Sequence, residues 1–257
     1  IIPRALTDME NPSTATEFMG MKLKTPVMIS PIACHGIAHT MAEVDTQKGA
    51  AAAGALFASS TYANKSVEDI AKAAPAAPRF FQLYLSKDWK FNEMVFDAIK
   101  KTGYKGIYLT VDALVSGYRE ANLRTKFTYP VPLDFFTRYL DGKGEGQSVA
   151  QMYASSAQKI GPEDVRRIKE ETGLPVIVKG VESVEDAYKA MGAGADGIYV
   201  TNHGGRQLDG GPAAIDVLPA IAKAVNPQVP IIFDSGVRRG SHVFKALALG
   251  ADMVGIG

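Results

Sequence analysis

Short runs of apolar, mostly β-branched residues recur along the chain at a nearly even spacing, and this recurrence restricts the possible folds more than any other feature. Each run shows little polar alternation, which is typical of parallel strands that are buried on both faces. The starts of the runs lie 28, 24, 27, 69, 22, 33 and 23 residues apart, and six of these seven gaps fit one strand–helix unit. The eight expected strands are 27–33, 55–61, 79–85, 106–112, 175–179, 197–202, 230–235 and 253–257.

The stretches between these runs carry helix start and stop signals. Ser66 and Ser183 each precede an acidic pair and can cap a helix N-terminus, and Pro162 is expected to open a helix that Gly173 closes. Eight strands that alternate with helices over 257 residues predict a TIM (β/α)8 barrel, whose usual size is about 250 residues. We expect a single domain over 1–257. An open, doubly wound sheet is the alternative, but it rarely needs eight evenly spaced units.

The 69-residue gap after the fourth run is the exception to this spacing. It contains an insertion at 113–160, which includes the polar, glycine-rich stretch 141–147. Long insertions in compact domains are commonly lids or disordered segments. This one follows the C-terminal end of a strand, the side on which barrel enzymes form their active sites, so we expect a lid.

Composition excludes several classes of function. The 28 Lys and Arg residues balance 27 Asp and Glu residues, for a formal charge of +1, so nothing indicates a surface for nucleic acid or an anionic membrane. No apolar run approaches the ~20 residues of a membrane span, and the N-terminus lacks the features of a signal peptide. The single cysteine, Cys34, cannot form an internal disulfide, which favours a cytoplasmic location.

Polar residues gather where the expected strands end. Because the parallel strands of a barrel all end on one face, we expect these side chains to converge on one site. Each of them alone could be a capping or solvated residue, but the convergence of so many argues for a shared function. They are Gln82, Tyr84, Thr110, Asp112, Lys179, His203, Arg206, Asp234 and Ser235.

Two motifs suggest the chemistry of that face. The segment IIFDSGVR at 231–238, followed by Gly240, is a strand that leads into a turn of small residues. Backbone N–H groups of such a turn can approach a phosphate, with Arg238 as the counter-charge, which predicts a phosphorylated cofactor or substrate. In TNHGGRQLDG at 201–210, His203 and Arg206 offer a base and an anion clamp within one flexible loop.

These two strings, together with PIACHGIAH, FQLY, LTVDALVSGYR and PVIVKG in the same order, closely resemble the FMN-dependent α-hydroxy acid oxidases and dehydrogenases. The resemblance covers nearly the whole chain, and the HGIAH turn and the RYLDGKGEG…QKIGPEDV insertion are most similar to bacterial L-lactate oxidases. It implies oxidation of a small L-2-hydroxy acid, foremost L-lactate to pyruvate, with O2 reduced to H2O2. A preference for glycolate or mandelate, or a dehydrogenase with another electron acceptor, stays open. The resemblance also implies a homo-oligomer, a tetramer.

The resemblance further implies which residues hold FMN. Lys179 matches the lysine placed near flavin N1 and O2, where a cation stabilises the charge of the reduced ring. FMN would also contact the backbone of Pro31, Ile32 and Ala33 and the residues Ser60, Gln82 and Thr110, and its phosphate would contact Asp234, Ser235, Gly236, Val237, Arg238 and Gly257.

The substrate residues follow from the same resemblance. Tyr84, Arg119 and Arg206 match the residues that hold the substrate carboxylate, and Tyr129 matches a pocket tyrosine. His203 would be the base, and Asp112 would orient it and stabilise its imidazolium. The sequence leaves open whether His203 removes the hydroxyl proton or the Cα proton.

The ends of the chain depart from the family pattern. Family members carry a further N-terminal helical segment, and beyond the eighth strand they continue with an arginine on the FMN phosphate and a closing helix. We therefore expect the N-terminal segment and the last helix to be missing here, which would weaken cofactor binding. A catalytically impaired barrel that acts only as a scaffold is one alternative.

Three other interpretations rest on single residues. His35 and His39 have the spacing of a helical metal pair, but the sequence offers no third ligand, so we expect no metal. Cys34 beside His35 could be a thiolate nucleophile, although one buried cysteine is more often part of the packing. A Schiff-base aldolase with Lys179 as the nucleophile would use the same fold without a flavin.

Overall fold

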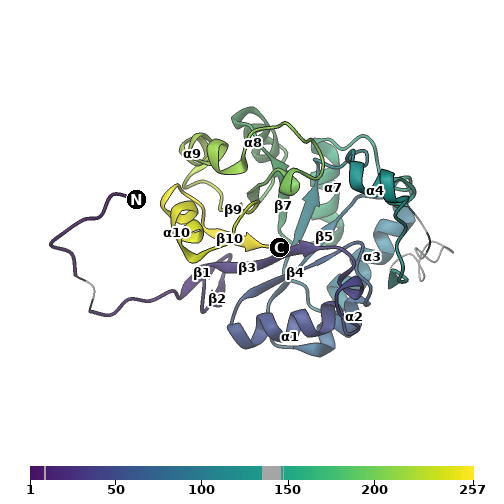
Figure 1. Ribbon diagram of the computed structural model, residues 1–257, viewed down its shortest axis with the longest axis horizontal. Helices are drawn as coiled ribbons and strands as arrows, with labels where there is room; N and C mark the ends of the chain where they lie inside the picture. Colours follow the sequence, from purple (N-terminus) through teal and green to yellow (C-terminus); the bar gives the residue numbers. More distant parts are fainter. Residues whose placement is uncertain (9, 135–145, 147) are drawn as a thin grey trace.

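The computed structural model describes residues 1–8, 10–134, 146 and 148–257, and its centre is a closed barrel of eight parallel strands (Figure 1). Each strand pairs with the next one along the chain, and the last strand closes on the first through Val254 opposite Val27. The strands are β3 (Val27–Ile32), β4 (Leu56–Ser60), β5 (Arg79–Leu83), β6 (Ile107–Thr110), β7 (Val176–Val181), β8 (Gly197–Val200), β9 (Ile231–Phe233) and β10 (Met253–Ile256).

The predicted TIM barrel and its eight strands are thus confirmed. Most strands end earlier than expected because their last residues already turn into the loops of one barrel face, whereas β7 continues to Val181. Ser66 and Ser183 cap their helices through their hydroxyl groups as predicted. The helix that begins at Pro162 is followed by Gly173 in a left-handed conformation, with φ 65°.

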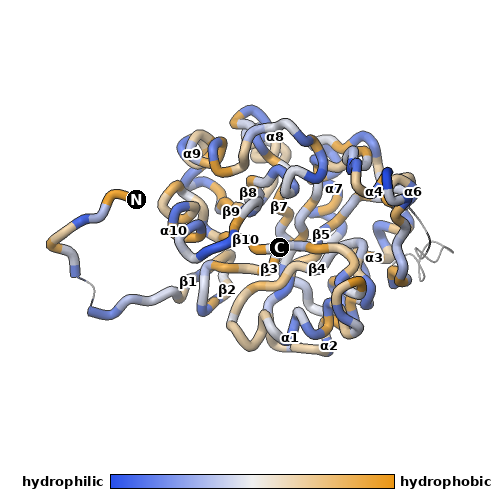
Figure 2. The backbone as a smooth tube through the Cα atoms, in the orientation of Figure 1, coloured by the Kyte–Doolittle hydropathy of each residue, from blue (hydrophilic) through white to orange (hydrophobic). Residues whose placement is uncertain are grey.

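Helices form the outer layer of the barrel (Figure 1). Figure 2 shows apolar colours along the barrel strands and a mixture of hydrophilic and apolar segments in the surrounding helices. This pattern is expected for helices that bury one stripe against a sheet. The helices that link successive strands are α1 (Glu43–Ala53), α2 (Val67–Ala73), α3 (Trp89–Lys101), α7 (Pro162–Thr172), α8 (Val184–Gly192), α9 (Ala214–Val225) and α10 (Gly240–Ala248).

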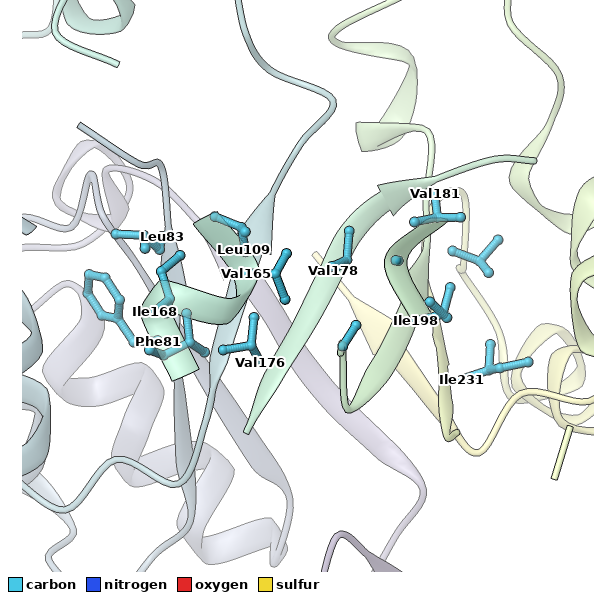
Figure 3. Packing of buried hydrophobic residues seen from close by; sticks show 14 of the residues in the cluster. Phe81, Leu83, Leu109, Val165, Ile168, Val176, Val178, Val181, Ile198 and Ile231 are labelled. Atoms are coloured by element: carbon cyan, nitrogen blue, oxygen red, sulfur yellow. The ribbon is translucent and has the colours of Figure 1, made fainter. Parts of the chain in front are cut away.

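The outward-facing side chains of the strands make the larger part of the core. Val176 and Val178 of β7 belong to the same buried cluster as Val165 and Ile168 of α7, next to Leu109 of β6 (Figure 3). Full burial of such side chains contributes about 1.5–3 kcal/mol each relative to exposure. This layer fixes the helices against the barrel.

The inward-facing side chains fill the barrel with an apolar layer, as is usual for this fold. Alternate residues of a strand face the same side, so the next inward positions, toward the strand ends, include Ser30, Gln82, Lys179 and Asp234. The inner face therefore changes from apolar to polar along the barrel axis, and the polar part lies where the strands end. One fully buried residue from each strand forms the apolar layer: Met28, Leu56, Phe80, Tyr108, Ile177, Tyr199, Ile232 and Met253.

A short hairpin, which is absent from the predicted elements, closes the other end of the barrel. Its strands β1 (Thr16–Phe18) and β2 (Met21–Leu23) pair antiparallel just before β3 begins. Phe18 and Leu23 are only 2% and 5% exposed and belong to the cluster inside the barrel. The ring of Phe18 lies 6.5 Å from the ring of Phe80. The hairpin therefore shields the apolar layer from water.

The predicted lid at 113–160 is described only in part, because 135–145 and 147 lie outside the described residues and most of the stretch 141–147 lies there too. The described part contains α4 (Glu120–Thr125) and α6 (Val149–Tyr153). It contacts the β4–α2 loop, where the Asn64 amide donates to the Pro132 carbonyl at 2.8 Å. A lid function stays a prediction. In the described part of the chain, no helix has the length and apolar character that a membrane crossing requires.

We expect Phe18→Ala to destabilise the protein by about 3 kcal/mol, because it removes a buried ring from the barrel end and leaves a cavity. Urea unfolding followed by circular dichroism measures this loss. Phe244→Ala is the matched control, since Phe244 is 56% exposed on α10 and such substitutions change stability by no more than about 0.5 kcal/mol. Equal stability of the two variants would contradict a plugging role for the hairpin.

Candidate active site

A cavity of about 1050 Å³ opens at the strand ends. Nearly all the residues predicted from sequence converge on it, although they come from every part of the barrel. Gln82, Thr110 and Asp112 are the predicted residues that do not line it. Those that do are Pro31, Ile32, Ala33, Ser60, Tyr84, Arg119, Tyr129, Lys179, His203, Arg206, Asp234, Ser235, Gly236, Val237, Arg238 and Gly257.

The Gln82 and Thr110 side chains are buried and belong to a chain of hydrogen bonds that begins at Ser60. The Ser60 hydroxyl donates to Gln82 Oε1 at 3.0 Å, and Gln82 Nε2 donates to Thr110 Oγ1 at 2.8 Å. Of these three residues, only Ser60 lines the cavity. Gln82 and Thr110 are 2% and 1% exposed and do not line the cavity, so their direct contact with a cofactor stays a prediction.

His203 begins the 3-10 turn η2 (His203–Gly205) directly after β8, with its backbone in the left-handed region at φ 57°. Its Nδ1 lies 2.9 Å from Asp112 Oδ2, and its Nε2 lies 3.2 Å from the Tyr84 hydroxyl. When Nδ1–H donates to Asp112, Nε2 keeps a lone pair that can accept a proton. The structure therefore brings His203 and Asp112 into contact, and their roles as base and orienting carboxylate stay predictions.

The electrostatics of this group favour a neutral imidazole. Burial and the Lys179 ammonium, 3.5 Å from Nδ1, lower the pKa of His203 and outweigh the opposing effect of Asp112. Burial alone would raise the pKa of Asp112, but Lys179 and His203 together lower it. At neutral pH the site therefore holds an anionic Asp112 beside a neutral His203, which is the state that a base requires.

Two further tyrosines, absent from the predicted site, complete the wall beside His203. The Tyr153 hydroxyl donates to the Tyr84 hydroxyl at 3.2 Å, and the Tyr62 ring stacks on the Tyr84 ring at 4.8 Å. Burial raises the pKa of Tyr84 well above its usual range, so its hydroxyl keeps its proton. Tyr62 follows Ser60 by two positions at the end of β4, and that alternation could have identified it. Tyr153 lies in the insertion, where no periodicity indicated its position.

Arg119 and Arg206 both line the cavity, as predicted for an anion clamp. Arg119 Nε donates to the Arg206 carbonyl oxygen at 3.4 Å, and its Nη2 donates to Gln207 Oε1 at 3.3 Å. The start of the insertion is thereby tied to the loop after β8. Gly117 permits this approach, because a Cβ at that position would overlap the Arg206 carbonyl oxygen. Two guanidinium groups on one cavity can bind a carboxylate through paired hydrogen bonds.

The far end of the cavity is formed by the turn between β9 and α10. Gly236 adopts φ 75°, and Arg238, Arg239 and Gly240 line the cavity where α10 begins. Guanidinium groups beside the amino end of a helix favour a phosphate. The buried Lys179, 3% exposed, supplies a second cationic point near His203. This donor set fits a long cofactor with a phosphate at one end and a group that gains negative charge at the other.

Two of the single-residue interpretations, the His35–His39 metal pair and the Cys34 nucleophile, gain no support from this geometry. No group of three or more His, Cys, Asp or Glu side chains suited to a metal ion occurs among the residues that the structure describes. Cys34 is buried, and burial, with a smaller effect from Glu43, raises its pKa to about 12. A thiol in that environment is protonated and unreactive at neutral pH.

Barrels of this type place their active sites at the C-terminal ends of the strands. The contact between His203 and Asp112 lies at this position in a (β/α)8 barrel, and it is an arrangement that can support acid–base chemistry. A family model described as "FMN-dependent dehydrogenase" matches residues 1–257. The chain belongs to this family.

Within this family, the chain is similar to several individual oxidases. The chain is 76% identical over 257 residues to an L-lactate oxidase of Lactobacillus jensenii, and it spans 63% of the length of that protein. A solved structure of a refolded Pediococcus acidilactici protein, described as a lactate oxidase, superposes with a TM-score of 0.94 at 56% identity, over 100% of this chain and 69% of that one. A mandelate oxidase structure with (S)-4-hydroxymandelic acid has a TM-score of 0.91 at 33% identity, over 100% of this chain and 73% of that one.

We expect an NMR titration of the His203 ring to give a pKa below the ordinary value of 6.5, since burial and Lys179 both lower it. With a folded-state pKa below the unfolded one, the contribution of His203 to stability is present above about pH 6.5 and is lost as the pH falls through the folded-state pKa. Lys179→Met should raise the His203 pKa. Lys189→Met, which removes an exposed lysine of α8, should leave it unchanged, and a wild-type value above 6.5 would contradict the electrostatic account.

Proposed function

We propose that this chain is the FMN-binding barrel of an oxidase that converts a small L-2-hydroxy acid, foremost L-lactate, to the 2-oxo acid. The observation that carries the proposal is His203 Nε2, held toward the cavity by the Nδ1 contact with Asp112 and accompanied there by two arginines. Such an arrangement can remove a proton from a bound carboxylic acid anion. The 76% identity to an L-lactate oxidase supports the choice of substrate.

The arginines and the tyrosines would orient the substrate. Arg119 and Arg206 would bind its carboxylate, because their guanidinium groups line the same cavity. Tyr84, which stays protonated, would donate a hydrogen bond beside His203. Tyr129 is nearly buried in the cluster that contains Cys34 and would limit the space left for the substrate side chain. This wall favours a short substrate such as lactate.

His203 would accept the substrate proton at Nε2, and the negative Asp112 would stabilise the resulting imidazolium through Nδ1–H. Lys179 opposes that protonation, since its charge lowers the pKa of His203. The base would therefore release its proton again readily after turnover. Either the hydroxyl proton or the Cα proton could be the one transferred.

FMN, when bound, would take two electrons from the substrate and pass them to O2, which yields hydrogen peroxide. Lys179 would lie where negative charge develops on the ring, and Arg238 would face the phosphate. The remaining residues proposed to contact FMN are Pro31, Ile32, Ala33, Ser60, Gln82, Thr110, Asp234, Ser235, Gly236, Val237 and Gly257.

The alternatives differ in substrate and in chemistry. A glycolate or mandelate preference remains compatible with the same site, and the family match weighs against a Schiff-base aldolase that uses Lys179. We also propose a homo-oligomer, a tetramer, in the cytoplasm, on the grounds of the family resemblance and the single cysteine.

Anaerobic mixing with L-lactate should bleach the flavin absorbance of the wild-type protein, and His203→Gln should slow this bleaching by about 10³-fold with FMN still bound. Stopped-flow spectroscopy measures the rate constant, and released flavin fluorescence reports cofactor occupancy. Tyr188→Phe, an exposed residue of α8, is the control. Near-normal bleaching in His203→Gln would remove this residue from the role of base.

The same assay with L-lactate, glycolate and (S)-mandelate in parallel identifies the preferred substrate. We expect L-lactate to be fastest, because the chain is 76% identical to an L-lactate oxidase. Admission of air should then produce one peroxide per flavin turnover. A faster reaction with mandelate, or no peroxide, would contradict the lactate oxidase proposal.

A further inference from the structure

Ser235 is held in a backbone conformation that serine rarely adopts. Its φ is 87°, in the left-handed region that favours glycine, and Gly236 beside it has φ 75°. Strain of this kind persists where the surrounding structure imposes it, and it is concentrated at functional sites. A glycine would remove the strain, so the serine side chain must contribute something that glycine lacks.

The Ser235 hydroxyl reaches across from the β9 end to the turn that carries His203. It accepts hydrogen bonds from the backbone N–H groups of Asn202 at 3.2 Å and Gly204 at 3.3 Å. It also donates to Asp234 Oδ1 at 3.2 Å and lies 3.1 Å from Thr201 Oγ1. These contacts are possible because β8 and β9 are neighbours in the barrel, with Val200 opposite Phe233.

Thr201 completes the arrangement on the β8 side. This residue is fully buried, and its Oγ1 accepts the backbone N–H of His203 at 3.0 Å. Two hydroxyl groups therefore accept hydrogen bonds from three successive backbone N–H groups, those of Asn202, His203 and Gly204. These N–H groups donate to the two hydroxyl groups and not to backbone carbonyl groups of a helix or strand.

We propose that Ser235, together with Thr201, is a positioning residue that fixes the 202–204 turn so that the His203 ring lies between Asp112 and Tyr84. This role differs from the contact with a cofactor phosphate expected of the 234–238 turn. It links the two ends of the cavity, because the turn that faces the phosphate also holds the turn that carries the base. The activity readout rests on the proposed function, but the position of the His203 ring does not.

Two substitutions of Ser235 distinguish the effect of losing the hydroxyl group from the effect of relieving the backbone strain. Ser235→Ala removes the hydroxyl and keeps the strained backbone, whereas Ser235→Gly removes the hydroxyl and relaxes it. Both variants should lose the positioning effect, and Ser235→Gly should have the higher melting temperature. Thr201→Val removes the companion hydroxyl at a site without unusual backbone. Ser59→Ala is the matched control, since Ser59 is a buried serine of β4 that donates to Tyr104, outside the cavity.

The first measurement is the NMR titration of His203 in the FMN-loaded protein without substrate. Burial is the largest cause of the low pKa of His203, so a loosened turn should raise it in Ser235→Ala, Ser235→Gly and Thr201→Val, but not in Ser59→Ala. The second is the anaerobic flavin reduction rate at saturating L-lactate, which should fall roughly 10- to 100-fold in the same three variants. The third is the FMN dissociation constant, which should change less than threefold in Thr201→Val, because Thr201 does not line the cavity.

Three results would overturn the proposal. A wild-type titration and reduction rate in Ser235→Gly would assign the effect of Ser235→Ala to strain. A large rise in the FMN dissociation constant with an unchanged His203 titration would make Ser235 a cofactor ligand only. An unchanged His203 titration in Thr201→Val would show that Thr201 does not help to position the turn. This result would refute the shared role of the two hydroxyl groups even if the Ser235 variants failed to fold. A shifted titration in a protein that does not oxidise lactate would refute the proposed function and leave the positioning role intact.

Discussion

Closure of the barrel between β10 and β3 is the constraint on which the rest of the structure depends. The pairing of Val254 with Val27 brings the last strand against the first, and above this pair Ser30 donates to Asp234 Oδ2 at 2.9 Å. Gly255 lines the cavity at the same level, and a Cβ there would overlap the Ser30 hydroxyl. The floor of the candidate site is thus built from the residues that close the sheet, so a barrel that failed to close would have no site.

Within that frame, three ionisable groups determine what the site can do. Lys179 is buried beside His203, and its charge acts on both members of the His203–Asp112 pair. Burial of a cation and an anion in one cavity is costly unless each compensates the other. Here the compensation leaves the imidazole neutral between them. The pKa of His203 is therefore a property of the group, and removal of Lys179 is expected to raise the pKa of both His203 and Asp112.

The sequence contained most of the fold because the strand signal is local and repeats eight times. It also indicated the face on which Lys179, His203 and Asp234 meet, since polar residues at the ends of parallel strands must converge. It could not show that the Gln82 amide donates to Thr110, because strand alternation gives the direction of a side chain but not its partner. Tyr153 was out of reach for a different reason. It lies on a short helix of the insertion, which has no repeat and no strand to set its position.

The loops around the cavity are held by buried side chains more than by regular secondary structure. On the β3 and β4 side, the fully buried Glu43 accepts backbone N–H groups of His35, Asn64 and Lys65, which ties together the two loops that carry Cys34 and Tyr62. Ser235 does the same on the β8 and β9 side. Each of these acceptors, the fully buried Glu43 and the half-buried Ser235, joins two neighbouring loops across the gap between their strands. Glu43 is the first residue of α1, whereas Ser235 lies in the loop after β9, so the loop backbone around the site is held by one side chain from a helix end and one from a loop.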